Sequence, residues 1–170
     1  MTATAKNAPT RRRAESLAMR IEEGAAKLAA FVAELSDAEW RVPVSSTDTR
    51  PVGVIVHHVA SVYPIEVQLA KAIAGGNAVS DVTWELVAGL NTKHAQQNAE
   101  ITKAAALELL QKNSREAAEA VRALTDEELD TAGPFSLNSG APLTAQFVIE
   151  DHAVRHSWHH LAGIKKTLRR

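Results

Sequence analysis

The chain contains no cysteine. A disulfide scaffold, a thiolate metal site and a cysteine nucleophile are therefore excluded. Charge of one sign is also lacking, because 19 Lys and Arg stand against 20 Asp and Glu and the formal net charge is -1. Dedicated binders of nucleic acid or anionic membranes usually carry a basic excess, so we expect neither partner. No apolar run approaches the roughly 18 residues that span a bilayer.

The N-terminus resembles neither a secretory signal nor the start of a folded domain. Arg11, Arg12 and Arg13 are followed by acidic residues instead of a hydrophobic stretch, so we expect a cytoplasmic protein. Residues 1–12 are small, polar and basic, and we predict a disordered tail there. Residues 13–170 have the length of one globular domain with a sizeable core.

Aromatic residues make up only 4% of the chain and strand-like alternation is scarce, whereas Ala, Leu, Glu and Lys are common. This composition favours helix almost throughout. Apolar spacing, capping-box pairs and Gly or Pro punctuation predict helices at 14–35, 51–74, 83–99, 103–124 and 143–168, short helical turns after Ser36 and Thr125, and loops at 40–50 and 133–142. Pro64 lies inside the second helix and predicts a kink or a local break. The whole pattern predicts an all-α four-helix bundle.

Histidine is the unusual residue of this sequence, with seven copies. His152, His156 and His160 follow one another in steps of four, which keeps them near one face of the last helix. His57 and His58 are adjacent on the second helix, where at most one of the two can face the same point. Two imidazoles from the last helix and one from the second can therefore share one divalent cation inside the bundle.

Three neutral imidazoles suit zinc, nickel, cobalt or iron, and they do not suit magnesium or calcium. Three protein ligands leave at least one coordination position for water or substrate, which is typical of catalytic sites. Two other metal-site patterns fail on spacing. Ser157 follows His156 where a zincin has Glu, and no Glu has a His three residues later, as ferritin-like di-iron sites require.

Several polar residues near the histidines have open interpretations. Asp151 and Glu150 either orient a ligand imidazole through its second nitrogen or lie on a solvated helix face. For Tyr63, packing near Pro64 is favoured over contact with a substrate. His94 stands between polar residues and is expected to be exposed.

Two segments resemble a known family. The stretch His156-Ser-Trp-His-His160-Leu-Ala-Gly-Ile resembles the last-helix signature of the DinB/YfiT-like metalloenzymes, which reads His, three residues, His, two residues, Gln, Ile. The stretch Pro51-Val-Gly-Val-Ile-Val-His-His58-Val-Ala is similar to the second-helix motif of that family. Gly163 stands where the family usually has Gln, so the side chain of this Gln is missing. The order of elements also fits nearly the whole chain after the tail.

The resemblance implies a four-helix bundle of DinB/YfiT type with a three-histidine metal site. Carried over position by position, the ligands are His58, His156 and His160, with His152 and His159 as neighbours. Relatives include metal-dependent thiol transferases that use bacillithiol or mycothiol and a maleylpyruvate isomerase that uses mycothiol. Bundles of this family often dimerise, so a homodimer is expected.

The function implied by the resemblance is transfer of a low-molecular-weight thiol to an electrophile. A divalent ion, zinc or nickel first and iron or cobalt next, would activate the thiol, and such a chain needs no cysteine of its own. A cleft between the second and last helices, closed by the loop at 135–142, is expected to admit the small-molecule substrate. The alternatives are a hydrolase with metal-bound hydroxide as the nucleophile and a non-catalytic metal-binding protein of stress response or interaction.

Overall fold

The computed structural model describes residues 11–170. Residues 1–10, where most of the predicted disordered tail falls, lie outside the described residues. The bundle consists of α1 Arg12–Ala33, α3 Val52–Ala74, α5 Lys103–Arg122 and a last helix made of α7 Ala145–Ile149, η2 Glu150–Val154 and α8 Arg155–Leu168. The connections contain α2 Asp37–Trp40, α4 Trp84–Gln97, α6 Asp126–Asp130, β1 Ala132–Phe135, η1 Ser136–Asn138 and β2 Ala141–Thr144.

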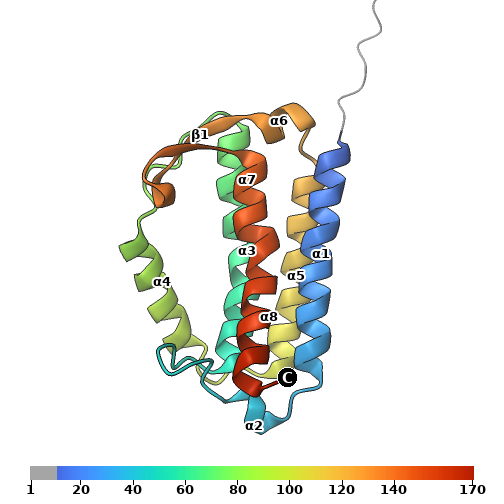
Figure 1. Ribbon diagram of the computed structural model, residues 1–170, viewed down its shortest axis with the longest axis vertical. Helices are drawn as coiled ribbons and strands as arrows, with labels where there is room; N and C mark the ends of the chain where they lie inside the picture. Colours follow the sequence, from blue (N-terminus) through green and yellow to red (C-terminus); the bar gives the residue numbers. More distant parts are fainter. Residues whose placement is uncertain (1–10) are drawn as a thin grey trace, which may run out of the picture.

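The predicted four-helix bundle is confirmed, with α1 and the last helix running one way and α3 and α5 the other (Figure 1). α4 stands outside the bundle and buries none of its residues. α3 is the central helix and packs against α5 and the last helix. By length and composition alone it could cross a membrane, but 61% of its most apolar window is buried inside the protein. Such burial is typical of a core helix.

Serine and threonine side chains begin most of the helices. Ser36 and Thr125 form the capping boxes that the sequence predicts, each accepting a hydrogen bond from the backbone of a glutamate three residues later. Thr83, Thr102 and Thr144 cap α4, α5 and α7 in the same way with their side-chain oxygens. Local sequence therefore determines where these helices begin.

Pro64 does not break α3, which runs as one helix from Val52 to Ala74. The proline has no N–H to donate to the carbonyl of Ala60, one turn earlier. The side-chain amide of Asn113, buried on α5, donates to that carbonyl at 2.8 Å instead. Of the predicted kink or local break, the break is therefore wrong, because a neighbouring helix supplies the missing hydrogen bond.

The predicted loop at 133–142 contains a short antiparallel hairpin in which β1 pairs with β2 from Ala132–Thr144 to Phe135–Ala141. The hairpin is also tied to the chain before α4, because the N–H of Val79 donates to the carbonyl of Pro134 at 2.9 Å. Phe135 is fully buried and anchors the hairpin in the core. The all-α prediction is thus incomplete by one two-stranded sheet.

The last helix begins at Ala145 and contains a π-helical turn, η2, over Glu150–Val154. The predicted helix over 143–168 has nearly the right length but lacks this turn. A π turn inserts one extra residue into the helix, and such turns occur often at functional sites. His152 lies inside η2, whereas His156 and His160 lie in the α-helical part that follows.

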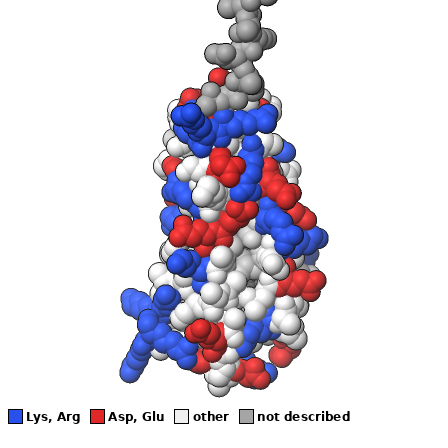
Figure 2. Space-filling model, turned by 90° about the vertical axis from the view of Figure 1, so that its right-hand side faces the viewer, with Lys and Arg blue, Asp and Glu red and all other residues white. Residues whose placement is uncertain are grey.

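The face formed by α1 and α5 carries both signs of charge. Figure 2 shows positive and negative side chains interspersed over it, with uncharged side chains between them. Arg122 of α5 donates to Glu22 of α1 at 2.7 and 2.9 Å and to Glu15 at 3.1 Å. This face therefore has no single-sign field for a polyanion.

Candidate metal centre

Three imidazoles from two helices meet between α3 and α8. One ring nitrogen of each of His58, His156 and His160 lies within 4.8 Å of those of the other two. The Nε2 atoms of His58 and His156 are 3.2 Å apart. Two nitrogen ligands of a tetrahedral zinc ion, each about 2.0–2.1 Å from the metal, are also separated by roughly 3.3 Å. The three rings could therefore hold one cation with small movements.

The spacing of the histidines along the last helix explains the position of two of the three rings. His156 and His160 lie one turn apart on α8, and their ring centroids are 4.8 Å apart. His58 faces them from α3, with centroid distances of 5.0 Å to His156 and 5.6 Å to His160. The adjacent His57 points elsewhere and is not part of the group. The structure thus brings together the three residues that the resemblance implies.

Burial keeps two of these rings neutral. Desolvation, together with the charge of the neighbouring His156, lowers the pKa of His58 to about 3 and that of His160 to about 2. Both rings are therefore unprotonated at neutral pH. An unprotonated imidazole nitrogen is the form that binds a metal.

Glu66 is the polar partner that sequence analysis missed. Its carboxylate oxygen Oε1 contacts Nδ1 of His156, and its side chain is almost fully buried. A carboxylate in this position accepts the Nδ1 proton and leaves Nε2 of the same ring free to bind a metal. Glu66 is the one acidic residue of the apolar helix α3. That isolation in an apolar helix was the signal available in the sequence.

Asp151 and Glu150 do not orient any of the three grouped rings. Glu150 pairs with Arg20 at 2.7 Å, and Asp151 pairs with Arg155 at 3.1 Å. Asp151 also approaches Nε2 of His152 at 3.9 Å. The solvated-face interpretation therefore describes both carboxylates better than the orienting one.

His152 and His159 lie next to the group, as the resemblance implies, without being part of it. The ring of His152 packs against Phe135 of the hairpin with centroids 5.5 Å apart, and burial lowers its pKa. His159 is exposed and meets the ring of His160 edge-on at 5.1 Å. Tyr63 is fully buried, and its hydroxyl bonds to that of Ser157 at 2.6 Å. The packing interpretation of Tyr63 therefore holds.

The expectation that His94 is exposed is wrong. His94 is half-buried on α4, and its Nε2 lies 2.8 Å from Nδ1 of His57. Its ring also meets His58 edge-on, with centroids 5.6 Å apart. His94 therefore borders the three grouped rings through His58, and its contact with His57 joins α4 to α3.

The surroundings of the three rings contain buried polar atoms without partners. In the part of the chain that the structure describes, four buried side-chain atoms have no hydrogen-bond partner. Two of them, Oε2 of Glu66 and Nδ1 of His94, belong to residues that contact the three rings. Two neutral imidazoles, a third imidazole in contact with a carboxylate, and unsatisfied polar atoms fit a divalent transition metal with its remaining ligands.

Comparison with known proteins agrees with this architecture. The family model of the DinB superfamily matches residues 20–164. Among solved structures the chain is similar to YfiT from Bacillus subtilis, with a TM-score of 0.74 and 21% identity over 99% of this chain and 93% of that one. YfiT is described as a probable metal-dependent hydrolase with an unusual four-helix bundle topology. No curated protein matches the chain. The match to the family model covers most of the chain, which therefore belongs to the DinB superfamily.

Proposed function

We propose that this chain is a metal-dependent enzyme that acts on small molecules, with one divalent transition ion held by His58, His156 and His160. The observation that carries the proposal is the convergence of these three imidazole nitrogens within 4.8 Å of one another. Zinc and nickel suit such a site best, and cobalt and iron come next. Three protein ligands leave room for a small molecule at the ion, as in catalytic metal sites.

The protein residues prepare this site in two ways. Burial holds His58 and His160 in the neutral form. Glu66 accepts the Nδ1 proton of His156 and so fixes the orientation of that ring. When bound, the metal supplies Lewis acidity that lowers the pKa of a thiol or a water molecule at the site.

Thiol transfer is the reaction that this residue set supports best. A thiol held at the ion would have a much lower pKa and would release its proton to solvent, so no protein base would be required. Oε1 of Glu66 contacts His156, so this carboxylate orients a ring in our proposal instead of acting as a base. The absence of cysteine from the chain agrees with the use of a free low-molecular-weight thiol. Hydrolysis is the second candidate, because the similar structure YfiT is described as a probable metal-dependent hydrolase.

Metal content tests the site. Mass spectrometry should find about one equivalent of metal in the wild type and much less in His58→Ala, His156→Ala and His160→Ala. His159→Ala is the matched control, because His159 is exposed beside the same rings and should leave the metal in place. Full metal content in all three ligand variants would refute the assignment.

Two model reactions separate the candidates. With cysteine and 1-chloro-2,4-dinitrobenzene, a sulfur–carbon bond forms, the carbon–chlorine bond breaks, chloride leaves and the thiol proton passes to solvent. We expect the zinc-loaded protein to accelerate this reaction and His160→Ala to lose the acceleration. Hydrolysis of p-nitrophenyl acetate without any thiol, abolished by the same variant, would favour the hydrolase instead.

A further inference from the structure

Arg50 lies near the end of the loop before α3. Asp48 fixes one side of its guanidinium. The backbone N–H and Nε–H of Arg50 donate to Oδ1 of Asp48 at 3.1 and 2.8 Å, and Nη2–H donates to Oδ2 at 2.6 Å. These bonds hold the pKa of Asp48 below its usual range, so the pair stays ionised. The carboxylate of Asp48 thus holds the backbone turn between Asp48 and Arg50, and it also fixes the plane of the guanidinium.

The other side of the same guanidinium has no partner among residues 11–170. There, Nη1 of Arg50 is buried and donates to no acceptor. Pairing with Asp48 uses only Nε, Nη2 and the backbone, so a purely structural role in the loop leaves Nη1 unexplained. A buried donor on a charged group is costly to leave unsatisfied. An oxygen from a ligand would satisfy it.

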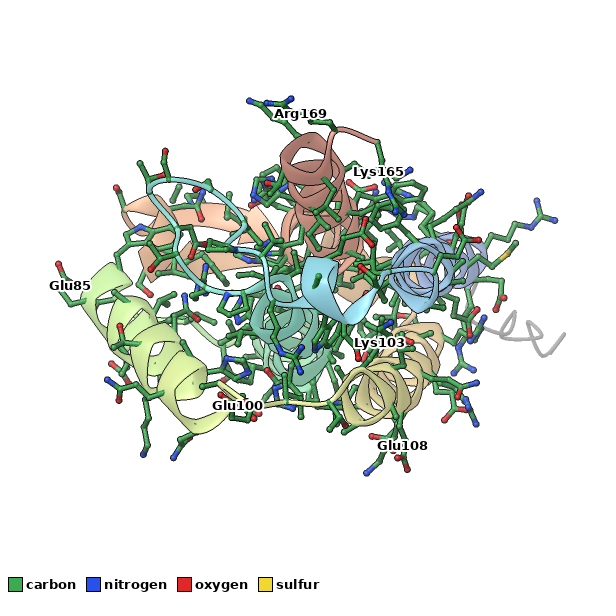
Figure 3. All side chains as sticks on the ribbon, turned by 90° about the horizontal axis from the view of Figure 1, so that it is seen from below. Glu85, Glu100, Lys103, Glu108, Lys165 and Arg169 are labelled. Atoms are coloured by element: carbon green, nitrogen blue, oxygen red, sulfur yellow. The ribbon has the colours of Figure 1, made fainter. Side chains whose placement is uncertain are left out.

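Arg50 also lies near the three-histidine site. The N–H of Val44 donates to the carbonyl of Arg50 at 3.0 Å, and the hydroxyl of Thr167 on α8 donates to the carbonyl of Val44. Seen from below in Figure 3, this loop passes between α4 and α8 at the end of α3. Burial is the main cause of the lowered pKa of His58 and His160, and the charge of Arg50 contributes a smaller part, so the guanidinium is within electrostatic reach of the rings.

We propose that Arg50 binds the anionic group, a carboxylate or a related oxyanion, of the small molecule that the three-histidine site uses. This inference rests on the proposed function. Arg50 and Asp48 cancel in charge, and Glu66 supplies one negative charge against the two positive charges of a divalent ion. The loaded site would therefore carry a net positive charge that favours an anionic ligand. The planar fork of arginine suits carboxylate and other oxyanions.

A matched pair of thiols tests the proposal on the zinc-loaded protein. 3-Mercaptopropionate and 3-mercapto-1-propanol carry the same thiol and differ in one carboxylate. Calorimetric titration should show the carboxylate-bearing thiol binding the wild type about tenfold or more tightly than the alcohol, as expected for a hydrogen bond to a charged group. In Arg50→Gln this ratio should fall close to one, while binding of the alcohol changes little.

General damage to the fold cannot produce this result, because it would weaken the binding of both thiols to the same extent. Arg50→Lys keeps the charge but not the fork and should retain only part of the preference. Arg20→Gln is the control, since Arg20 pairs with Glu150 on the surface and should leave the ratio unchanged. An unchanged ratio in Arg50→Gln would overturn the role of Arg50.

Zinc content of the same samples reports on the proposed function separately. If the wild type held no zinc, that function would fail, and the metal-free protein would decide the role of Arg50. Titration with sodium sulfate at constant ionic strength should then shift the backbone amide signal of Val52 saturably in the wild type and not in Arg50→Gln. Equal shifts in both proteins, or none in either, would overturn the inference.

Discussion

At the scale of single residues, the carboxylate of Glu66 is the most informative side chain outside the three rings. It is buried in α3 and contacts the ring of His156 from the side opposite to the nitrogen that faces His58. We predict that Glu66→Gln lowers metal affinity about 10- to 100-fold, because an amide orients the ring less strongly than a carboxylate does. Competition with a chromophoric chelator measures the change.

Glu150→Gln is the control for this prediction, because Glu150 pairs with Arg20 and not with a ring of the group. Metal affinity should stay at the wild-type value there. Equal affinities in Glu66→Gln and the wild type would show that the buried carboxylate does not orient His156.

The low pKa values of the buried histidines predict how stability depends on pH. Between about pH 6.5 and pH 3 the unfolded chain protonates His58 and His160, whereas the folded chain does not. The unfolded state thus binds more protons, and the free energy of unfolding of the metal-free protein should fall as pH falls, by up to about 1.4 kcal/mol per histidine and pH unit. Above about pH 7 the two rings should have no effect.

Urea unfolding at a series of pH values measures this dependence. The double variant His58→Asn, His160→Asn should show a shallower decline below pH 6.5, because it lacks two of the groups that take up protons on unfolding. Parallel pH profiles for the two proteins would contradict the assigned protonation states.

The candidate site was predictable only as far as one helix at a time allows. The step of four between His156 and His160 places both rings on one face, and the resemblance to a family motif selected His58. Contacts between helices are not encoded in such spacing. Glu66 reaches a ring 90 residues away, and His94 bonds to a ring 37 residues away. Tertiary packing therefore decides the surroundings of the three rings.

At the scale of secondary-structure elements, the continuity of α3 depends on a side chain from α5. Asn113 donates a hydrogen bond to the carbonyl of Ala60, to which Pro64 cannot donate because it has no N–H. We predict that Asn113→Ala lowers the free energy of unfolding by about 1–3 kcal/mol, the cost of a buried acceptor left without a donor. In the background of Pro64→Ala, the new N–H can donate to the carbonyl of Ala60. Asn113→Ala should then lower the free energy of unfolding clearly less.

Chemical denaturation of the four proteins in this double-mutant cycle measures the coupling. Asn98→Ala is a useful control, because the carbonyl that Asn98 contacts already accepts the backbone N–H of Asn98. Its cost should be smaller than that of Asn113→Ala. Identical costs of Asn113→Ala with and without Pro64 would contradict this explanation of the unbroken helix.

Elements with strong local signals were predicted well, and those without such signals were missed. The capping residues Ser36 and Thr125 and the apolar stripes placed the helices within a few residues. The hairpin strands have four residues each and pair through Pro134 and Pro142, which are poor strand formers. The π turn η2 has helical composition, so nothing in its residue types distinguishes it from α-helix.

At the scale of the whole molecule, a bound ion would join α3 to α8. An ion that binds the folded chain and not the unfolded chain stabilises the fold by about 2.7 kcal/mol when the free ion is at 100 times its dissociation constant. We predict that zinc raises Tm by roughly 5–10 °C for a domain of this size. Thermal unfolding with zinc and with chelator measures the shift.

The triple variant of His58, His156 and His160 to alanine should show no such shift, because zinc would no longer prefer the folded chain. A zinc-dependent rise in Tm that persists in this variant would place the ion elsewhere in the protein. The homodimer and the cytoplasmic location stay predictions of the sequence and its family resemblance.

X-ray absorption at the metal edge of the zinc-loaded protein tests the central claim most directly, because it counts the ligands around the ion. We predict three imidazole nitrogens at about 2.0–2.1 Å and one oxygen ligand that does not come from the protein. Added thiol should replace this oxygen with sulfur at about 2.3 Å. Fewer than three imidazoles, or a fourth protein ligand that no thiol displaces, would contradict the account.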